Sequence, residues 1–367
     1  MKHVVVLGAA GKMGRGIALL LLQHLVVKGS RLTLVDPDVE ALYELRPFFE
    51  TSLRRFAEKR INHLRPLYQE RRDLVDNSAI IDAFIKERLD ALRFQKEPSG
   101  LSEVDLVFEA APEMIDLKIA LLHSVKETGA PVLTNTSSIP IHYLAEEAGL
   151  SGRLVGFHFY NPAHLQPLVE LIFDREALKA EAYDLVEKLE KRPVVSKDIA
   201  GFIGNGHFLR EVSYAVQVTN ALGVNQENLS FVDRVTRDYL LRPMGIFELV
   251  NFVGVDVVLK IAGVMEHFLE MDLQLASLKE FKEIPLTKEE SGLELSWKAL
   301  RKDKKKEDKV EAYEKWLTDA EGKEASFARD YLSESRRISL QLVETGVAAS
   351  IEDVHTVLKL GFQQVLV

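Results

Sequence analysis

One of the ten histidines, His158, stands among apolar and aromatic residues in the stretch Val155–Pro162, at the end of a predicted strand. Glu170 lies within the next apolar stretch, 168–172. A buried carboxylate needs a partner, and a neutral imidazole held by a carboxylate is a general base near neutral pH. The pair therefore predicts proton abstraction from a substrate. Taken alone, a core histidine and an unrelated edge-strand glutamate explain it better, so the interpretation depends on the surrounding chain.

Three glycines, Gly8, Gly11 and Gly14, separate the β-branched run 3–7 from apolar residues at helical spacing. This pattern of strand, tight turn and helix presents backbone N–H groups and the positive helix end to a diphosphate. The spacing is one residue longer than the strict G-x-G-x-x-G pattern. An ordinary glycine turn is the alternative. The predicted cofactor-binding residues of the turn are Gly8, Gly11, Lys12, Met13 and Gly14.

Asp36 closes a second predicted strand, Leu32–Val35, and lies 22 residues after Gly14 (36 − 14 = 22). An acidic residue at this distance hydrogen-bonds the ribose of a bound dinucleotide. Its negative charge would repel a 2′-phosphate, which favours NAD over NADP. Without a cofactor, Asp36 would be a helix cap.

Two further predicted strands end in polar residues. The strand at 104–110 is followed by Glu113 and Lys118, and the strand at 131–134 is followed by a serine-rich loop that contains Ser137. The carboxyl ends of parallel strands form one ligand crevice. We therefore expect these side chains to face the same cleft as the glycine turn, although a serine-rich loop taken alone is more typical of a turn or a helix cap.

The order of elements predicts an α/β region followed by an all-α region: a Rossmann-type, doubly wound nucleotide domain with an inserted helical pair, then a helical domain with a partial internal repeat. The predicted boundaries are 1–197 for the nucleotide domain, with the insertion at about 39–92, then 198–282 for the helical domain, 283–325 for a polar linker and 326–367 for the second repeat.

Composition narrows the function. The chain has 367 residues and a net charge of −9, which argues against nucleic acid or an anionic membrane as a partner. It has no cysteine, which excludes disulfides, thiol catalysis and cysteine metal sites, and no metal is predicted. The apolar run 17–27 is shorter than the ~20 residues that span a bilayer. The first strand begins almost at Met1, so we expect no leader and a cytoplasmic location.

Several motifs, in their order and spacing, resemble the L-3-hydroxyacyl-CoA dehydrogenases, enzymes of fatty-acid β-oxidation, over about residues 1–270. The matching stretches are 11–18, 135–138, 156–162, 168–170, 201–205 and 243–249.

The resemblance implies that His158 removes the proton of the substrate 3-hydroxyl while hydride passes from C3 to the nicotinamide of NAD. Glu170 would orient the imidazole and stabilise its charged form. Ser137 and Asn205 would hydrogen-bond the reacting oxygen or the thioester carbonyl.

The resemblance also assigns residues that bind the cofactor and the acyl-CoA thioester substrate. The matching NAD contacts are Asp36, Glu113, Lys118 and Asn161. Ser52 and Lys59, in the inserted basic segment, match positions that contact CoA, whose phosphates are anionic.

The chain departs from the family pattern at Gly206, which replaces an arginine usual after Asn205, and it carries a second partial helical repeat from about Ala328. This repeat is similar to the dehydrogenase half of fused multifunctional β-oxidation enzymes. Stand-alone family members pair through their helical domains. We therefore expect a homodimer, or a monomer whose C-terminal repeat covers the dimer face. A hydratase or thiolase partner is compatible with either.

Two other functions remain open from the sequence: a dehydrogenase of CoA-free hydroxy acids or sugar acids on the same fold, and a non-catalytic NAD-binding protein. Ser52 and Lys59 argue against the first. The joint presence of the His158–Glu170 pair, Ser137 and Asn205 argues against the second.

Overall fold

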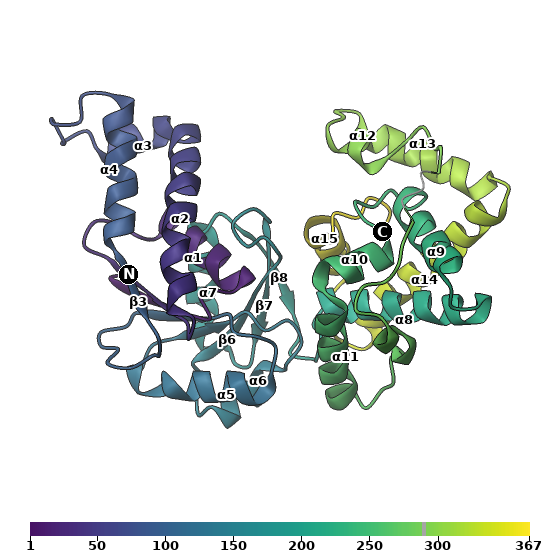
Figure 1. The fold of residues 1–367 in the computed structure, drawn as a ribbon, viewed down its shortest axis with the longest axis horizontal. Helices are drawn as coiled ribbons and strands as arrows, with labels where there is room; N and C mark the ends of the chain where they lie inside the picture. The colour runs from purple at the N-terminus through teal and green to yellow at the C-terminus, as the bar shows by residue number, and fades with distance from the viewer. Residues whose placement is uncertain (288–290) are drawn as a thin grey trace. The chain divides into compact units, whose positions relative to one another are not determined.

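The computed structural model describes residues 1–287 and 291–367, and the chain forms two compact units (Figure 1). The first unit comprises Met1–Thr136 and Ile141–Pro193, and the second comprises Ser137–Pro140 and Val194–Val367.

The first unit is built on a mainly parallel sheet, with the strand order β3-β2-β1-β4-β5-β6-β7-β8. The strands from β3 to β6 pair in parallel, and β6 pairs with β7 in antiparallel. The last strand, β8, crosses from the first unit into the second. The predicted Rossmann-type fold is confirmed. The strands are β1 (His3–Leu7), β2 (Arg31–Val35), β3 (Leu92–Gln95), β4 (Leu106–Glu109), β5 (Val132–Thr134), β6 (Leu154–Phe159), β7 (Leu168–Phe173) and β8 (Arg192–Ser196).

The sequence explains why this sheet is buried. All five residues of β1 and all six of β6 are buried. Strands that are covered on both faces have mostly apolar sequences, without the alternation of polar and apolar residues that is typical of half-exposed strands. The first helix, α1, is likewise apolar around most of its circumference. The helices of this unit are α1 (Lys12–His24), α2 (Val39–Lys59), α3 (Ile61–Leu67), α4 (Asn77–Asp90), α5 (Ile115–Ser124), α6 (Ile141–Glu147) and α7 (Lys179–Lys188).

The predicted pair of inserted helices is confirmed as α2 and α4, and a short helix that was not predicted, α3, lies between them in the chain. Helix α2 packs along α4, and both extend beyond the sheet (Figure 1). Asp38 caps α2 by accepting the Ala41 N–H at 2.9 Å, and Asp76 caps α4 by accepting the Ala79 N–H at 2.8 Å. The strand that follows, β3, was not predicted, because its four residues, of which only Leu92 is buried, form too short a pattern.

The second unit is helical and has an apolar core that includes Phe208, Val232 and Tyr331. The segment 283–325, predicted as a polar linker, contains α12 and α13 and buries Leu300 in this core. Helix α14 packs against α8 and α9. The helices are α8 (Gly204–Leu222), α9 (Gln226–Asp238), α10 (Ile246–Val253), α11 (Val255–Leu269), α12 (Trp297–Arg301), α13 (Lys306–Asp319), α14 (Lys323–Glu344) and α15 (Ile351–Gly361).

Two side chains of α9 cap the amino end of α10. Asp233 accepts the Glu248 N–H at 2.7 Å, and Thr236 Oγ1 accepts the Ile246 N–H at 3.0 Å. A Cβ at position 245 would lie 2.3 Å from Asp233 Cγ, so only glycine fits there. Burial, together with the charge of Glu248, raises the pKa of Asp233 to about 6.

Replacing Asp233 with asparagine is expected to remove a pH-dependent loss of stability. The pKa of Asp233 is 3.8 in the unfolded chain and about 6 in the folded protein, so its carboxyl lowers the free energy of unfolding as pH rises between these two values. The total loss is at most about 3 kcal/mol. Urea unfolding at pH 4 to 7 measures this, followed by the fluorescence of Trp297 and Trp316, the chain's two tryptophans, which both lie in this unit. The same slope with pH in both proteins would contradict the assignment.

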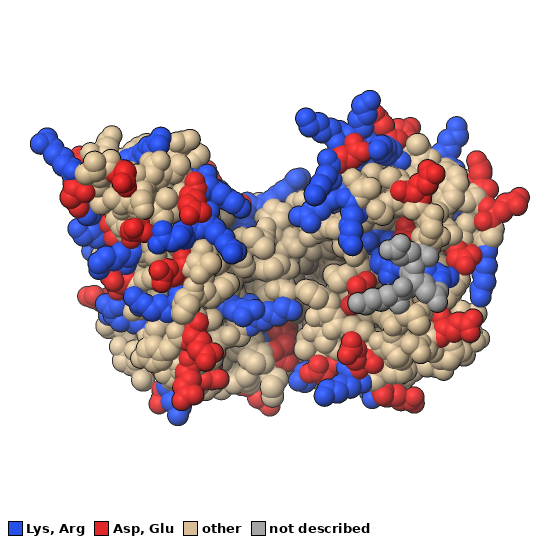
Figure 2. Space-filling model, turned by 45° about the horizontal axis from the view of Figure 1, so that its top comes forward, with Lys and Arg blue, Asp and Glu red and all other residues tan. Residues whose placement is uncertain are grey.

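Basic and acidic side chains are interspersed over the surface of each unit on the face shown in Figure 2. Within the described ranges 1–287 and 291–367, no helix combines the length and the apolar character that crossing a membrane requires.

Candidate functional site

The glycine turn joins β1 to α1 and is shaped by two steric requirements. Gly8 has a φ of +73°, and a Cβ on it would lie 2.8 Å from the backbone carbon of Ala110. A Cβ on Gly14 would lie 2.0 Å from the Gly8 carbonyl oxygen, so this glycine lets α1 approach the turn. Gly11 is the N-cap of α1 and provides no side-chain cap. The start of the helix therefore presents backbone donors to an anion.

Asp36 is held at this same turn. Its Oδ2 accepts the Ala10 N–H at 3.0 Å, and its Oδ1 accepts the Asp38 N–H at 3.1 Å. The first bond ties the longer glycine turn to the end of β2. The predicted ribose ligand and the predicted diphosphate turn are thus neighbours, as a dinucleotide requires.

Glu109, which was not among the predicted site residues, is a buried carboxylate that links the ends of β4 and β5. It accepts the Ala111 N–H at 2.6 Å, the Thr134 hydroxyl at 2.5 Å and the Lys118 ammonium at 2.9 and 3.0 Å. Its position as the only charged residue at the end of the apolar strand β4 is the signal that could have identified it.

Lys118, predicted to contact NAD, is 1% exposed and also donates to the Ala111 carbonyl at 3.0 Å. Burial alone would lower the pKa of Lys118, but Glu109 and Glu113 raise it above its usual value. Glu113 lies 3.5 Å from the Lys118 ammonium and accepts the Thr136 hydroxyl at 2.7 Å. Lys118 is therefore positioned to hold Glu109 and Glu113 in place.

The structure brings His158 and Glu170 together. They are directly opposite each other in the register of β6 and β7, and His158 Nδ1 lies 2.8 Å from Glu170 Oε2. Glu170 is fully buried. A carboxylate acceptor places the imidazole proton on Nδ1 and leaves Nε2 as the basic nitrogen.

Two neighbours complete this region, and one of them was not predicted. The Tyr160 hydroxyl donates to Glu170 Oε2 at 2.7 Å. Asn135 Oδ1 accepts the Phe159 N–H at 2.8 Å, which ties the loop after β5 to the end of β6. Asn161, a predicted NAD contact, follows directly after Tyr160 and is half-buried.

Ser137 and Asn205 belong to the second unit, where the Asn205 amide donates to the Ser137 carbonyl at 3.0 Å. At the neighbouring Gly206, a Cβ would lie 3.2 Å from Leu342 of α14. The space beside the residue that departs from the family pattern is thus filled by the C-terminal repeat.

Ser52 and Lys59 lie on α2 seven residues apart, which places them near one face of the helix. Lys59 is exposed and, within the described residues, lies within ion-pair distance of no carboxylate, whereas the nearby Arg54 pairs with Asp82 at 2.9 Å.

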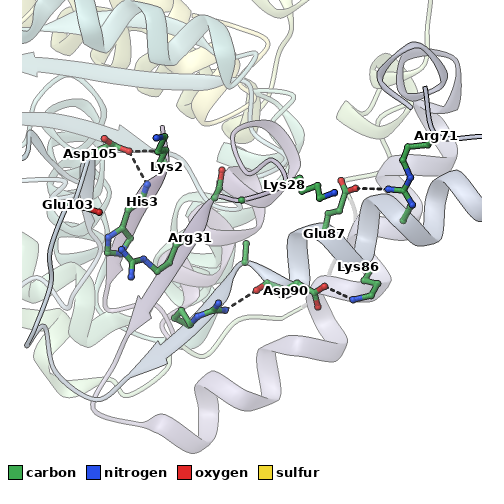
Figure 3. A pocket seen from close by; sticks show the side chains of 15 residues that line it. Lys2, His3, Lys28, Arg31, Arg71, Lys86, Glu87, Asp90, Glu103 and Asp105 are labelled. Atoms are coloured by element: carbon green, nitrogen blue, oxygen red, sulfur yellow. Dashed lines mark hydrogen bonds and ion pairs between the residues drawn. The ribbon is translucent and has the colours of Figure 1, made fainter. Parts of the chain in front are cut away.

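A cavity of about 800 Å³ lies at the amino ends of strands β1 and β2 (Figure 3). Its lining includes His3, where β1 begins, and Arg31, where β2 begins. The predicted dinucleotide crevice would lie instead at the carboxyl ends of these strands. Asp90 in the lining already pairs with Lys86 at 2.5 Å. The part of the chain that the structure describes contains no cluster of residues suited to a metal ion.

Comparison with known proteins shows which family the chain matches. The family model of the 3-hydroxyacyl-CoA dehydrogenase NAD binding domain matches residues 3–199, and that of the C-terminal domain matches residues 201–310. The mitochondrial hydroxyacyl-coenzyme A dehydrogenase of Rattus norvegicus is 29% identical over 263 residues, covering 70% of this chain and 77% of the relative. The 3-hydroxybutyryl-CoA dehydrogenase of Bradyrhizobium diazoefficiens is 31% identical over 274 residues, covering 73% and 84%.

The fold is also that of a solved relative. The crystal structure of 3-hydroxybutyryl-CoA dehydrogenase from Escherichia coli has a TM-score of 0.67 at 21% identity, covering 99% of this chain and 89% of that one. Both family models together span most of the sequence. The chain therefore belongs to the 3-hydroxyacyl-CoA dehydrogenase family and is an NAD-dependent dehydrogenase.

Proposed function

We propose that this protein oxidises L-3-hydroxyacyl-CoA thioesters to 3-ketoacyl-CoA in fatty-acid β-oxidation or 3-hydroxybutyryl-CoA metabolism, with His158 as the general base. The observation that carries the proposal is the 2.8 Å contact between His158 Nδ1 and the buried Glu170. Nε2 of His158 takes the proton of the 3-hydroxyl, and Glu170 stabilises the imidazolium that results.

The cofactor site fits NAD. The glycine turn would hold the diphosphate, since a Cβ at Gly8 or Gly14 would collide with backbone, and Asp36 would accept the ribose hydroxyls. When bound, NAD accepts the hydride that leaves C3 of the substrate. Ser137 and Asn205 are proposed to hydrogen-bond the reacting oxygen or the thioester carbonyl, which would hold the substrate in place for transfer.

The CoA part of the substrate is assigned to α2. Lys59 is exposed and lacks an ion-pair partner among the described residues, so its ammonium is available to a phosphate. Ser52, two turns earlier, would donate a hydrogen bond from the same region of the helix.

The direct test compares two substrates in an NADH oxidation assay. We expect turnover with acetoacetyl-CoA and at least tenfold lower kcat/KM with acetoacetate, which lacks the CoA that α2 would bind. Turnover of CoA-free acids without turnover of the thioester would contradict the proposal and favour the hydroxy-acid dehydrogenase alternative.

Replacing Asp36 with alanine is expected to reduce the preference for NADH over NADPH by about tenfold or more, since a hydrogen bond to a charged group contributes ~1.5–3 kcal/mol. The ratio of kcat/KM values for the two cofactors measures this preference. Asp38→Ala is the matched control, because Asp38 caps α2 and lies only two residues away. An unchanged ratio in the Asp36 variant would remove this residue as the ribose ligand.

A further inference from the structure

Glu170 receives two hydrogen bonds on one oxygen atom. His158 Nδ1 lies 2.8 Å from Oε2, and the Tyr160 hydroxyl lies 2.7 Å from the same atom. The rings of His158 and Tyr160 lie side by side, with centroids 4.9 Å apart. The two donors therefore share the negative charge of one carboxylate oxygen.

The strand pattern explains how Tyr160 reaches this position. Side chains alternate along β6 and its continuation, so His158 and Tyr160 point to the same face of the sheet. Glu170 on β7 is directly opposite His158 and diagonal to Tyr160. Tyr160 is 8% exposed, so its hydroxyl exchanges little with water and needs a partner in the protein.

The phenol remains protonated in this setting. Burial, and then the negative charge of Glu170, raise the pKa of Tyr160 well above its usual value. The hydroxyl therefore stays a hydrogen-bond donor throughout the pH range in which a histidine titrates.

We propose that Tyr160 is a positioning residue that fixes the Glu170 carboxylate and takes up part of the negative charge that this carboxylate presents to His158. The Tyr160 hydroxyl on Oε2 takes up part of the charge that would otherwise act on the imidazolium, so it weakens the attraction between the Glu170 carboxylate and protonated His158. The inference rests on the proposed role of His158 as the base.

Most ionisable side chains on the neighbouring elements of the first unit are exposed. Helix α6 packs against both strands, and its ionisable residues are the exposed His142, Glu146 and Glu147 and the partly buried Tyr143. Helix α7 contacts β7, and all of its ionisable side chains are at least partly exposed. β5, the neighbour of β6, has no ionisable side chain. Exposed groups are screened by water and salt, whereas Tyr160 is a buried neutral donor in direct contact with Glu170.

The test is Tyr160→Phe, which keeps the ring and removes only the hydroxyl. In the cofactor-free protein, we expect the titration midpoint of the His158 ring resonance to rise by about 0.5–1 pH unit, measured by NMR. The signal is assigned by its absence in His158→Gln. In substrate oxidation, the acid limb of the kcat/KM profile should shift upward by the same amount, so that the rate at a pH below this limb falls about 3–10-fold.

The matched control is Tyr313→Phe, which removes another largely buried hydroxyl, the donor to the Tyr239 carbonyl at 3.1 Å in the second unit. This control should change neither the titration midpoint of His158 nor the acid limb of the kcat/KM profile. A His158 midpoint that is unchanged or lowered in Tyr160→Phe would overturn the inference. Because the NMR titration needs no substrate, that result is distinct from failure of the proposed function, which would appear as an absence of turnover in the wild-type protein.

Discussion

Replacing His158 with glutamine is expected to lower kcat for oxidation of L-3-hydroxybutyryl-CoA by about 10²–10⁴-fold, the usual contribution of a general base. Glutamine has no basic nitrogen, so the 3-hydroxyl proton must leave to water as hydride departs. Its amide can still donate to Glu170, which keeps a partner for the buried carboxylate and preserves the fold. Steady-state rates of NADH formation measure the effect.

The control for this substitution is His123→Gln, because His123 is exposed near the end of α5. It should leave kcat unchanged, and NADH affinity should be unchanged in both variants. Equal rates in His158→Gln and the wild-type protein would remove His158 as the base. Glu170→Gln should cause a smaller loss than His158→Gln, because the imidazole remains while its charged partner is lost.

The parts of the site that could be predicted from the sequence are those encoded within one short stretch. The glycine turn, Asp36 and the two strands that carry His158 and Glu170 are each local patterns, and all are found where expected. The pairing of His158 with Glu170 needed one further step, that neighbouring apolar strands lie side by side in a sheet.

The unpredicted parts depend on several segments that converge only in the folded chain. Glu109 contacts Ala111 in the loop after β4, Lys118 in α5 and Thr134 in β5. Tyr160 looks like a core aromatic residue until β7 places Glu170 diagonally across from it. No periodic pattern contains this information, because the partners are neither at fixed spacing nor of one residue type.

A buried ion pair in the second unit, which joins α8 to the loop before α10, likewise could not be predicted from a local sequence pattern. Arg242 donates to both oxygens of Glu211, at 3.0 and 2.7 Å, and their exposures are 5% and 2%. The Arg242 guanidinium also lies over the ring of Tyr331 from α14, 5.6 Å from its centroid. Burial alone would raise the pKa of Glu211, but Arg242 and His207 hold it below its usual value.

Replacing Arg242 with methionine is expected to lower the free energy of unfolding of the second unit by about 3–5 kcal/mol at pH 7, because Glu211 would remain buried without its partner. Denaturant unfolding followed by fluorescence of Trp297 and Trp316 measures this unit, which contains both tryptophans.

Two results distinguish an uncompensated charge from a simple loss of packing. In Arg242→Met, burial raises the folded-state pKa of Glu211, so the variant loses stability as pH rises, whereas in the wild-type protein the depressed pKa makes stability fall as pH decreases. The difference between the two proteins should therefore shrink from pH 7 toward pH 4.5. The double variant Glu211→Leu with Arg242→Met should recover most of the lost stability, since both charges are gone. A loss that is independent of pH and unchanged in the double variant would show that the contribution of Arg242 lies in its packing against Tyr331.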